Sequence, residues 1–339
     1  MHLNAVRSRI LMAVLLVAVG GTAAAQPAPP APAPAAAQAA EESAIVIVGK
    51  DGWLFPAWGS LSTVDPAAVQ ASTQLIAEAS RRLAARGVRL EVLVLPDKVT
   101  FYEDRLPAGR QVSASVKQRY DTLLASLAAA GVQALDARKV LATVQAGGVE
   151  VFYRSDQHWT QPAADATAVA LAAKIKAEVP QLAGTPGSGM PLGSEVKERR
   201  YGDLAELFLP PDQRSAIGRE TFVVRRAAQT QSLLDEGPAP VHVTGHSMVQ
   251  AYFGFPQKLS NALDRPVTVN WKAGNVGPWV VLLEYLESAE FRSNPPQVLV
   301  WQMFEPVYGF GPEARGQWDN ASIMTAAQWQ ARLNAALGP

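Results

Sequence analysis

Apolar runs alternate with amphipathic segments from residue 44 to the end of the chain. The run LEVLVLP at 90–96 is almost wholly apolar, which is typical of a parallel strand buried on both faces. Further strands are predicted at 44–49 and 53–55 (a hairpin), 133–135, 149–153, 240–245, 266–271 and 297–304. Helical spacing of apolar residues predicts helices at 67–86, 113–130, 161–178, 247–253 and 279–291.

This alternation of strands and helices predicts one α/β domain over residues 44–339, a doubly wound and mostly parallel sheet with helices on both faces. Thr160 is expected to cap the helix 161–178, with Pro162 in its first turn. The Gly- and Pro-rich segment 181–200 is predicted to be a loop. In sheets of this kind, active sites lie at the carboxyl ends of the strands.

The N-terminus has the pattern of a secretory signal peptide. Arg7 and Arg9 precede an apolar run at 10–21, and the small residues Ala23 and Ala25 favour cleavage after Ala25. The alternative is a retained anchor in the inner membrane, but the run is short for a membrane span. We therefore predict a signal peptide at 1–25 and an exported protein of the bacterial periplasm.

Residues 26–43 are rich in proline and alanine and are predicted to be an extended linker. Two interpretations remain open: a tether that holds the domain away from a partner or exit channel, or a plain spacer.

Composition narrows the function. The chain has no cysteine, which excludes disulfides and thiolate metal sites, and its four histidines form no cluster in the sequence. Lys plus Arg equals Asp plus Glu at 30 each, which argues against nucleic acid as a partner. We expect no metal and no cofactor.

Candidate chemistry follows two predicted strands. Asp156 and His158 come directly after the strand 149–153, and Ser247 begins a predicted helix after the strand 240–245. A serine on such a turn lies near backbone N–H groups and the positive end of a helix dipole. His158 is then the candidate base, and Asp156 would orient it.

Four motifs give this chain a resemblance to a known family. They are GKDGWLF at 49–55, LPDKVTFYEDRLP at 95–107, DQHW at 156–159 and GHS at 245–247. In this order they resemble the alginate O-acetyltransferase AlgJ/AlgX group of SGNH-like proteins, also called DHHW-type. The acid and base precede the serine, a permuted order compared with ordinary SGNH hydrolases. One residue departs from the pattern: His246 stands where the family has aspartate.

The resemblance implies a periplasmic O-acetyltransferase that uses Ser247, His158 and Asp156 to acetylate an exported polysaccharide. It also implies a membrane-bound O-acyltransferase as the partner that donates the acetyl group, and a chain that acts as a monomer or within a secretion or acetylation complex. Two rivals stay open: a polysaccharide acetylesterase of the same fold, and a non-catalytic polysaccharide-binding subunit.

Other site residues follow from the same motifs and turns. The Ser247 N–H, Gly274 and the Asn275 amide are candidates for an oxyanion hole, although KAGNVGP at 272–278 also reads as a plain polar turn. Lys98 is expected either to pair with a carboxylate or to line the cleft, and Trp58 to stack on a sugar ring. His246 is a competing base, and His242 is expected to be a core or surface residue.

Overall fold

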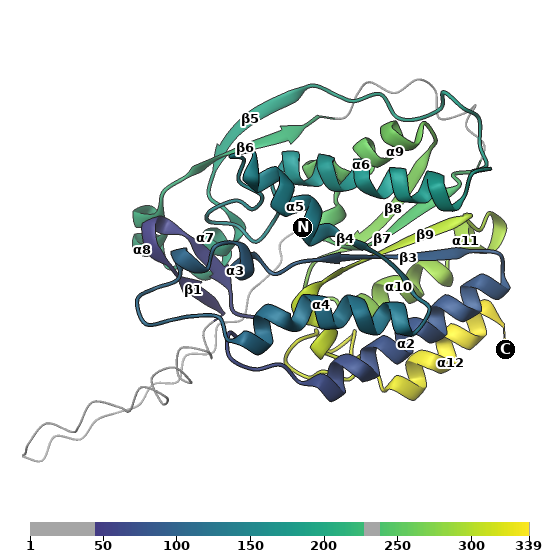
Figure 1. Cartoon of the computed structure of the whole chain (residues 1–339), viewed down its shortest axis with the longest axis horizontal. Helices are drawn as coiled ribbons and strands as arrows, with labels where there is room; N and C mark the ends of the chain where they lie inside the picture. The colour runs from purple at the N-terminus through teal and green to yellow at the C-terminus, as the bar shows by residue number, and fades with distance from the viewer. Residues whose placement is uncertain (1–44, 227–237, 339) are drawn as a thin grey trace, which may run out of the picture. The chain divides into compact units, whose positions relative to one another are not determined.

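A computed structural model of the chain describes residues 45–226 and 238–338, and a five-stranded sheet lies at its centre (Figure 1). The strand order is β4-β3-β9-β7-β8, and every neighbouring pair is parallel. These strands are β3 (Arg89–Leu95), β4 (Gln133–Asp136), β7 (Val241–His246), β8 (Val267–Lys272) and β9 (Val298–Phe304). The central strands β3, β7 and β9 are buried almost throughout, as continuous apolar runs require.

Helices cover both faces of the sheet (Figure 1). One layer holds α5 (Ala137–Ala146), α6 (Gln161–Glu178) and α9 (Phe255–Leu263). The other holds α2 (Pro66–Ala85), α4 (Ala114–Ala129), α10 (Pro278–Leu286) and α12 (Ala326–Leu337). The α/β doubly wound architecture predicted from the alternation of elements is therefore confirmed.

Two small antiparallel sheets and several short helices complete the described part. The sheets pair β1 (Val46–Val48) with β2 (Leu54–Pro56), and β5 (Glu195–Arg200) with β6 (Glu220–Arg225). The short α-helices are α3 (Lys98–Phe101), α7 (Asp203–Phe208), α8 (Pro211–Ile217) and α11 (Ala289–Ser293). Turns of 3-10 helix are η1 (Lys50–Gly52), η2 (Glu103–Arg105), η3 (Ser247–Val249), η4 (Ala251–Phe253) and η5 (Glu305–Gly309).

Several elements differ from the sequence predictions. The strand predicted at 149–153 is wrong: this segment makes only an isolated bridge. The helix predicted at 247–253 is two 3-10 turns, and the loop predicted at 181–200 contains β5. Thr160 does precede α6, but its hydroxyl donates to the Glu150 carbonyl at 2.7 Å and does not cap the helix.

The N-terminal predictions, a signal peptide at 1–25 and a linker at 26–43, lie outside the described residues. Within 45–226 and 238–338, no helix combines the length and the apolar character that crossing a bilayer requires.

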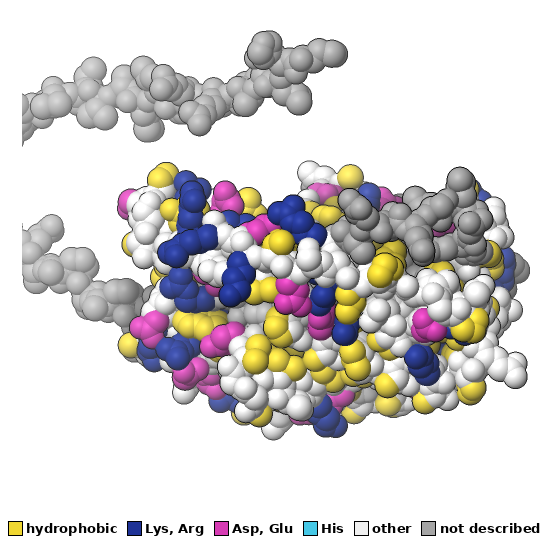
Figure 2. Space-filling view, turned by 90° about the horizontal axis from the view of Figure 1, so that it is seen from above, with side chains coloured by type: hydrophobic (Ala, Val, Ile, Leu, Met, Phe, Trp, Pro, Cys, Tyr) yellow, Lys and Arg dark blue, Asp and Glu magenta, His cyan; other side chains and the backbone are white. Residues whose placement is uncertain are grey.

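On the face shown in Figure 2, basic and acidic side chains are interspersed with apolar ones, and basic groups lie closest together at the left, where Figure 1 places α7 and α8.

Candidate active site

Asp156 and His158 lie at the tip of a tight hairpin. Phe152 and Trp159 form its single antiparallel bridge, and the Tyr153 N–H donates to the His158 carbonyl at 3.1 Å. A buried turn therefore positions both candidate residues. The sequence-based prediction that they follow the end of a sheet strand is wrong.

Lys98 fixes this hairpin to the end of β3. Its ammonium lies within hydrogen-bond distance of the carbonyls of Leu54 (2.6 Å), Tyr153 (2.7 Å), Arg154 (2.9 Å) and Asp156 (2.9 Å). The residue is fully buried, and burial lowers the pKa of Lys98 to about 7. Of the two roles expected for Lys98, the favoured structural role fits this geometry, and lining of the cleft does not, because the charged group is buried among these carbonyls. The carboxylate pairing considered as the alternative is replaced by backbone carbonyls.

Three predicted residues form a continuous hydrogen-bonded relay. Asp156 Oδ1 lies 2.6 Å from His158 Nδ1, and His158 Nε2 lies 2.7 Å from the Ser247 hydroxyl oxygen. The imidazole also stacks on Phe253, with 4.5 Å between ring centroids. This packing and the hydrogen bond to Asp156 fix the orientation of the ring.

Asp156 is kept ionised although it is fully buried. Burial by itself raises the pKa of a carboxyl group. Here the His158 ring and the N–H donors of His158 (2.9 Å) and Asp203 (3.0 Å) outweigh it, and they hold the pKa of Asp156 well below its usual range. A permanent negative charge therefore faces the inner nitrogen of the histidine.

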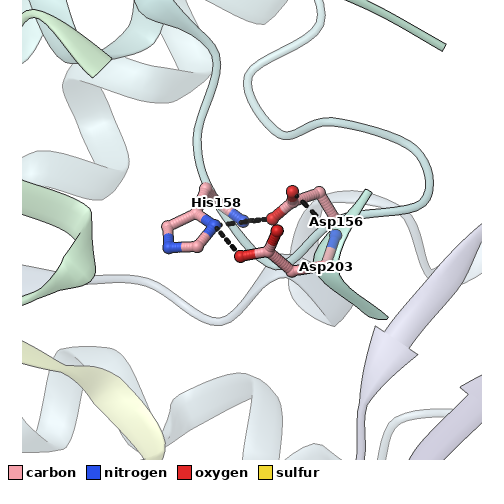
Figure 3. A group of neighbouring side chains, drawn as sticks. All are labelled: Asp156, His158 and Asp203. Atoms are coloured by element: carbon pink, nitrogen blue, oxygen red, sulfur yellow. Dashed lines mark hydrogen bonds and ion pairs between the residues drawn. The ribbon is translucent and has the colours of Figure 1, made fainter. Parts of the chain in front are cut away.

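A second carboxylate, Asp203 from the first turn of α7, also faces His158 (Figure 3). Its Oδ2 lies 3.5 Å from His158 Nδ1, and its Oδ1 accepts a hydrogen bond from Arg200 at 3.2 Å. Burial, and then the neighbouring charge of Asp156, raise the pKa of Asp203. Sequence reasoning missed both Asp203 and Arg200, which lie in or next to a segment without a recognisable motif.

Ser247 follows β7 directly, and the turn is tightly packed. A Cβ atom on Gly245 would lie 2.7 Å from the side-chain oxygen of Gln302, so only glycine fits beside β9 at this position. The Trp159 ring N–H donates to the carbonyl of Met248 at 2.9 Å. The hairpin that carries the base is thus bonded to the turn that carries the serine.

His246 and His242 are buried and have partners of their own. His246 Nε2 lies 2.6 Å from the Val276 carbonyl, so this nitrogen carries the proton and donates to an oxygen. His242 is stacked on Tyr285, with ring centroids 3.4 Å apart, which makes it a core residue. Burial lowers the pKa of each histidine to about 4. The alternative of His246 as the base therefore does not fit its geometry.

A cleft of about 730 Å³ opens beside Ser247 and is also lined by Gly274, Asn275 and Trp58. The structure thus brings the candidate oxyanion donors to the same cavity as the serine. Asn275 is held in place, since its amide donates to Asp319 Oδ2 at 3.2 Å.

Asp156, His158 and Asp203 also form the one group in the described residues with ligand atoms close enough for a metal ion, all within 4.8 Å of one another. The oxygens of Asp156 already accept backbone N–H groups from His158 and Asp203. Our expectation that no metal is required stays a prediction.

The fold and the site define an SGNH hydrolase-like protein. It is of the permuted kind, because the acid and the histidine precede the serine in the chain, and the serine lies on a turn at the end of a strand. The chain belongs to the family described as "SGNH hydrolase-like domain, acetyltransferase AlgX", whose model matches residues 46–305. It is accordingly an acyltransferase of the O-acetyltransferase class.

Known relatives agree with this assignment. The chain is 30% identical over 275 residues to the probable alginate O-acetylase AlgJ of Pseudomonas fluorescens, covering 77% of this chain and 67% of the relative. It is 27% identical over 311 residues to the AlgJ of Pseudomonas aeruginosa, covering 86% and 76%. The solved O-acetyltransferase domain of Pseudomonas putida AlgJ has a TM-score of 0.69 and 26% identity, covering 86% of this chain and 99% of that domain. The AlgX structure from Pseudomonas aeruginosa shares the fold, with a TM-score of 0.62 at 16% identity, covering 86% of this chain and 67% of AlgX.

Proposed function

We propose that this protein transfers an acetyl group through Ser247 onto hydroxyl groups of an exported polysaccharide. One observation carries the proposal: the unbroken relay from Asp156 through His158 to a serine that borders an open cleft. A binding subunit without catalysis has no need of such alignment.

In the first half-reaction, Ser247 attacks the carbonyl carbon of the acetyl donor while His158 Nε2 takes the hydroxyl proton. The negative charge of Asp156 stabilises the imidazolium that forms. The proton then passes to the leaving group, and acetyl-Ser247 remains. The Ser247 N–H, Gly274 and Asn275 are proposed to stabilise the oxyanion.

In the second half-reaction, a sugar hydroxyl attacks acetyl-Ser247. His158 takes the proton of that hydroxyl and returns it to the serine oxygen as the bond to the acetyl carbon breaks. The products are an acetylated sugar and free Ser247. In this scheme an acetylesterase differs only in using water in place of the sugar, so the acceptor has to be tested directly.

The cellular setting belongs to the same proposal. A signal peptide at 1–25, cleaved or retained as an inner-membrane anchor, would place the domain in the periplasm. A membrane-bound O-acyltransferase would supply the acetyl group, and the linker at 26–43 would give the domain reach toward that partner. Alginate is the polymer in the relatives' names, and it is one of the acceptors to be tested.

The test uses Ser247→Ala, His158→Ala and Asp156→Asn with an acetyl reporter ester. Each should lower turnover by about a thousandfold or more, because members of such a relay act as a unit. Ser126→Ala is the matched control, since this serine is half-buried on α4 and its hydroxyl donates only to the Thr122 carbonyl within that helix. Mass spectrometry should find acetyl-Ser247 in the wild type. Wild-type turnover in Ser247→Ala would refute the nucleophile assignment.

A further inference from the structure

The loop 273–276 brings two of the proposed oxyanion donors to the cleft beside Ser247. It follows β8, which runs parallel to β7, so the loop leaves the sheet at the same edge as the serine. Gly274 and Asn275 of this loop line the cleft together with the serine. Gly274 borders open space, because a Cβ atom there would have no neighbour within 4 Å apart from the adjoining residues. Where these donors lie therefore depends on what holds the loop.

On the solvent side, the loop is bonded to the segment that precedes α12. The Asn275 side-chain amide donates to Asp319 Oδ2 at 3.2 Å, and the Asp319 N–H donates to the Asn275 carbonyl at 2.9 Å. The pair of side chains is exposed. Just after the loop, Gly277 lies against Trp318, since a Cβ atom there would lie 3.1 Å from the indole ring. These contacts hold the loop from one side only.

On the side of the sheet, the loop is held by His246. The Nε2 of this buried ring donates to the Val276 carbonyl at 2.6 Å. Burial keeps the ring neutral by lowering the pKa of His246 to about 4, so its one N–H is committed to this bond. Among the described residues, no other side chain of the central sheet bonds to the loop. His246 ends β7 and is not among the described residues that line the cleft, whereas the next residue, Ser247, is.

This hydrogen bond depends on the residue by which the chain departs from its family's pattern. Aspartate, which the resemblance leads us to expect at position 246, is only an acceptor when it is ionised and has no proton to donate to a carbonyl. Its oxygens and the Val276 oxygen would repel each other. The histidine therefore makes a contact to the loop that the aspartate could not make.

We infer that His246 is a positioning residue for acetyl transfer. By holding the Val276 carbonyl, it fixes the loop 273–276 so that the two proposed donors of this loop reach the oxyanion that forms beside Ser247. His246 exchanges no proton with the substrate and forms no covalent bond to it, and His158 remains the base. The inference rests on the proposed function and adds a residue to the parts that carry it out.

The experiment measures kcat and KM of the full-length chain with an acetyl reporter ester. His246→Leu removes the donor, and kcat should fall about thirtyfold to a hundredfold, since a shift of about 1 Å or the loss of one oxyanion donor has an effect of that size. KM should change less than about threefold, because the oxyanion exists only in the transition state. His246→Gln keeps an amide donor and should restore kcat to within about fivefold of wild type. Should His246→Leu not fold, His246→Met fills the site with a flexible side chain that has no donor.

His242→Leu is the matched control for a purely structural role. His242 is a second buried histidine of β7, and its pKa is also lowered to about 4. Its ring nitrogens bond to Thr268 (2.7 Å) and Asn270 (2.8 Å), at the other end of the strand from the serine. Its replacement should lower the urea midpoint of unfolding but leave kcat unchanged when activity is measured at low temperature on the folded protein.

A double-mutant cycle with Asn275→Ala tests whether His246 acts through the loop. The loss of kcat caused by His246→Leu should shrink to less than about tenfold in the Asn275→Ala background, because one of the donors that His246 positions is already gone. Equal losses in both backgrounds would overturn the inference. So would a wild-type kcat in His246→Leu, a folded His246→Gln that is no faster than His246→Leu, or an equal loss in His242→Leu. Failure of the proposed function appears separately, as the absence of acetyl-Ser247 in the wild type.

Discussion

Replacing Lys98 by methionine tests how the acid–base hairpin is held. Methionine has a similar length and no hydrogen-bond donor, so Lys98→Met removes the ammonium and leaves most of the packing against Trp53 and Phe55. The carbonyls of Tyr153 and Asp156 would lose the single donor that the described residues offer them. Both carbonyls belong to the hairpin that carries His158.

The expected loss of stability follows from these two carbonyls. A buried acceptor left without a partner costs about 1–3 kcal/mol, which gives about 2–6 kcal/mol for the pair. Burial of the Lys98 charge acts in the opposite direction, as the lowering of its pKa to about 7 shows. We therefore expect the free energy of unfolding to fall by about 2–4 kcal/mol, in the lower half of that range. Activity should fall about a hundredfold, because a displacement of the base by about 1 Å has that effect.

Urea unfolding followed by tryptophan fluorescence measures the first quantity, and turnover of an acetyl ester at low temperature measures the second. Lys139→Met is the matched control: this lysine is 83% exposed and paired with Asp136, so its loss should cost less than about 1 kcal/mol. If Lys98→Met were no more destabilising than Lys139→Met and kept its activity, the hydrogen bonds of Lys98 would not be what positions the hairpin.

Three further predictions concern charge. Asp203→Asn keeps the backbone N–H that donates to Asp156 but removes a carboxylate 3.5 Å from His158 Nδ1. The single-turnover rate of acetyl-Ser247 formation should therefore fall about threefold to tenfold. An unchanged or faster rate would contradict a supporting role for Asp203. The pKa of His242 and of His246 is about 4 in the folded protein and 6.5 in the unfolded chain. Between pH 6.5 and pH 4 the unfolded chain therefore binds more protons than the folded protein, so the free energy of unfolding falls as the pH drops through this range. Urea titrations should show a loss of a few kcal/mol from pH 7 to pH 5, and equal stability at both would show that burial does not keep these rings neutral. Ester turnover should survive a strong chelator, whereas loss restored by a divalent ion would indicate metal-assisted chemistry.

The sequence was most informative where burial and periodicity agree. The helix 161–178 has the predicted bounds, and the strands at 90–96, 240–245, 266–271 and 297–304 lie within one or two residues of β3, β7, β8 and β9. Long apolar runs bounded by turns leave few alternatives to a parallel strand. The order of the motifs then indicated that the segment with Asp156 and His158 would meet the turn with Ser247.

Short apolar runs were less informative. The segment VEVFY at 149–153 has the composition of a strand, because all its side chains except Glu150 are β-branched or aromatic, and its residues from 151 on are buried. A buried hairpin contains the same types of residue as a buried sheet strand, so the sequence does not distinguish the two. The opposite error occurred at β5, whose residues EVKERR alternate between exposed and half-buried positions with only one apolar side chain. A strand of that composition has no hydrophobic period to detect.

Asp203 could not be predicted because tertiary packing brings it to the site. A Cβ atom on Gly202 would lie 2.4 Å from the backbone of Ser155, so the start of α7 lies directly against the hairpin. Its neighbour Asp203 reaches His158 only through this contact, across 45 residues of chain. The relay of Asp156, His158 and Ser247 was predicted from motif order, and the structure supplies its distances.

The hydrogen bond from the Trp159 ring to the Met248 carbonyl affects how the site responds to thermal motion. Trp159 adjoins the base and Met248 adjoins the serine, so one bond joins the two segments next to the reacting atoms. When either segment shifts, the other is carried with it, and the two move in phase. We therefore expect the distance between His158 and Ser247 to fluctuate less than the position of either residue relative to the rest of the domain. The base and the nucleophile are thus aligned by a direct bond between their own segments, in addition to the packing that holds each segment in the domain.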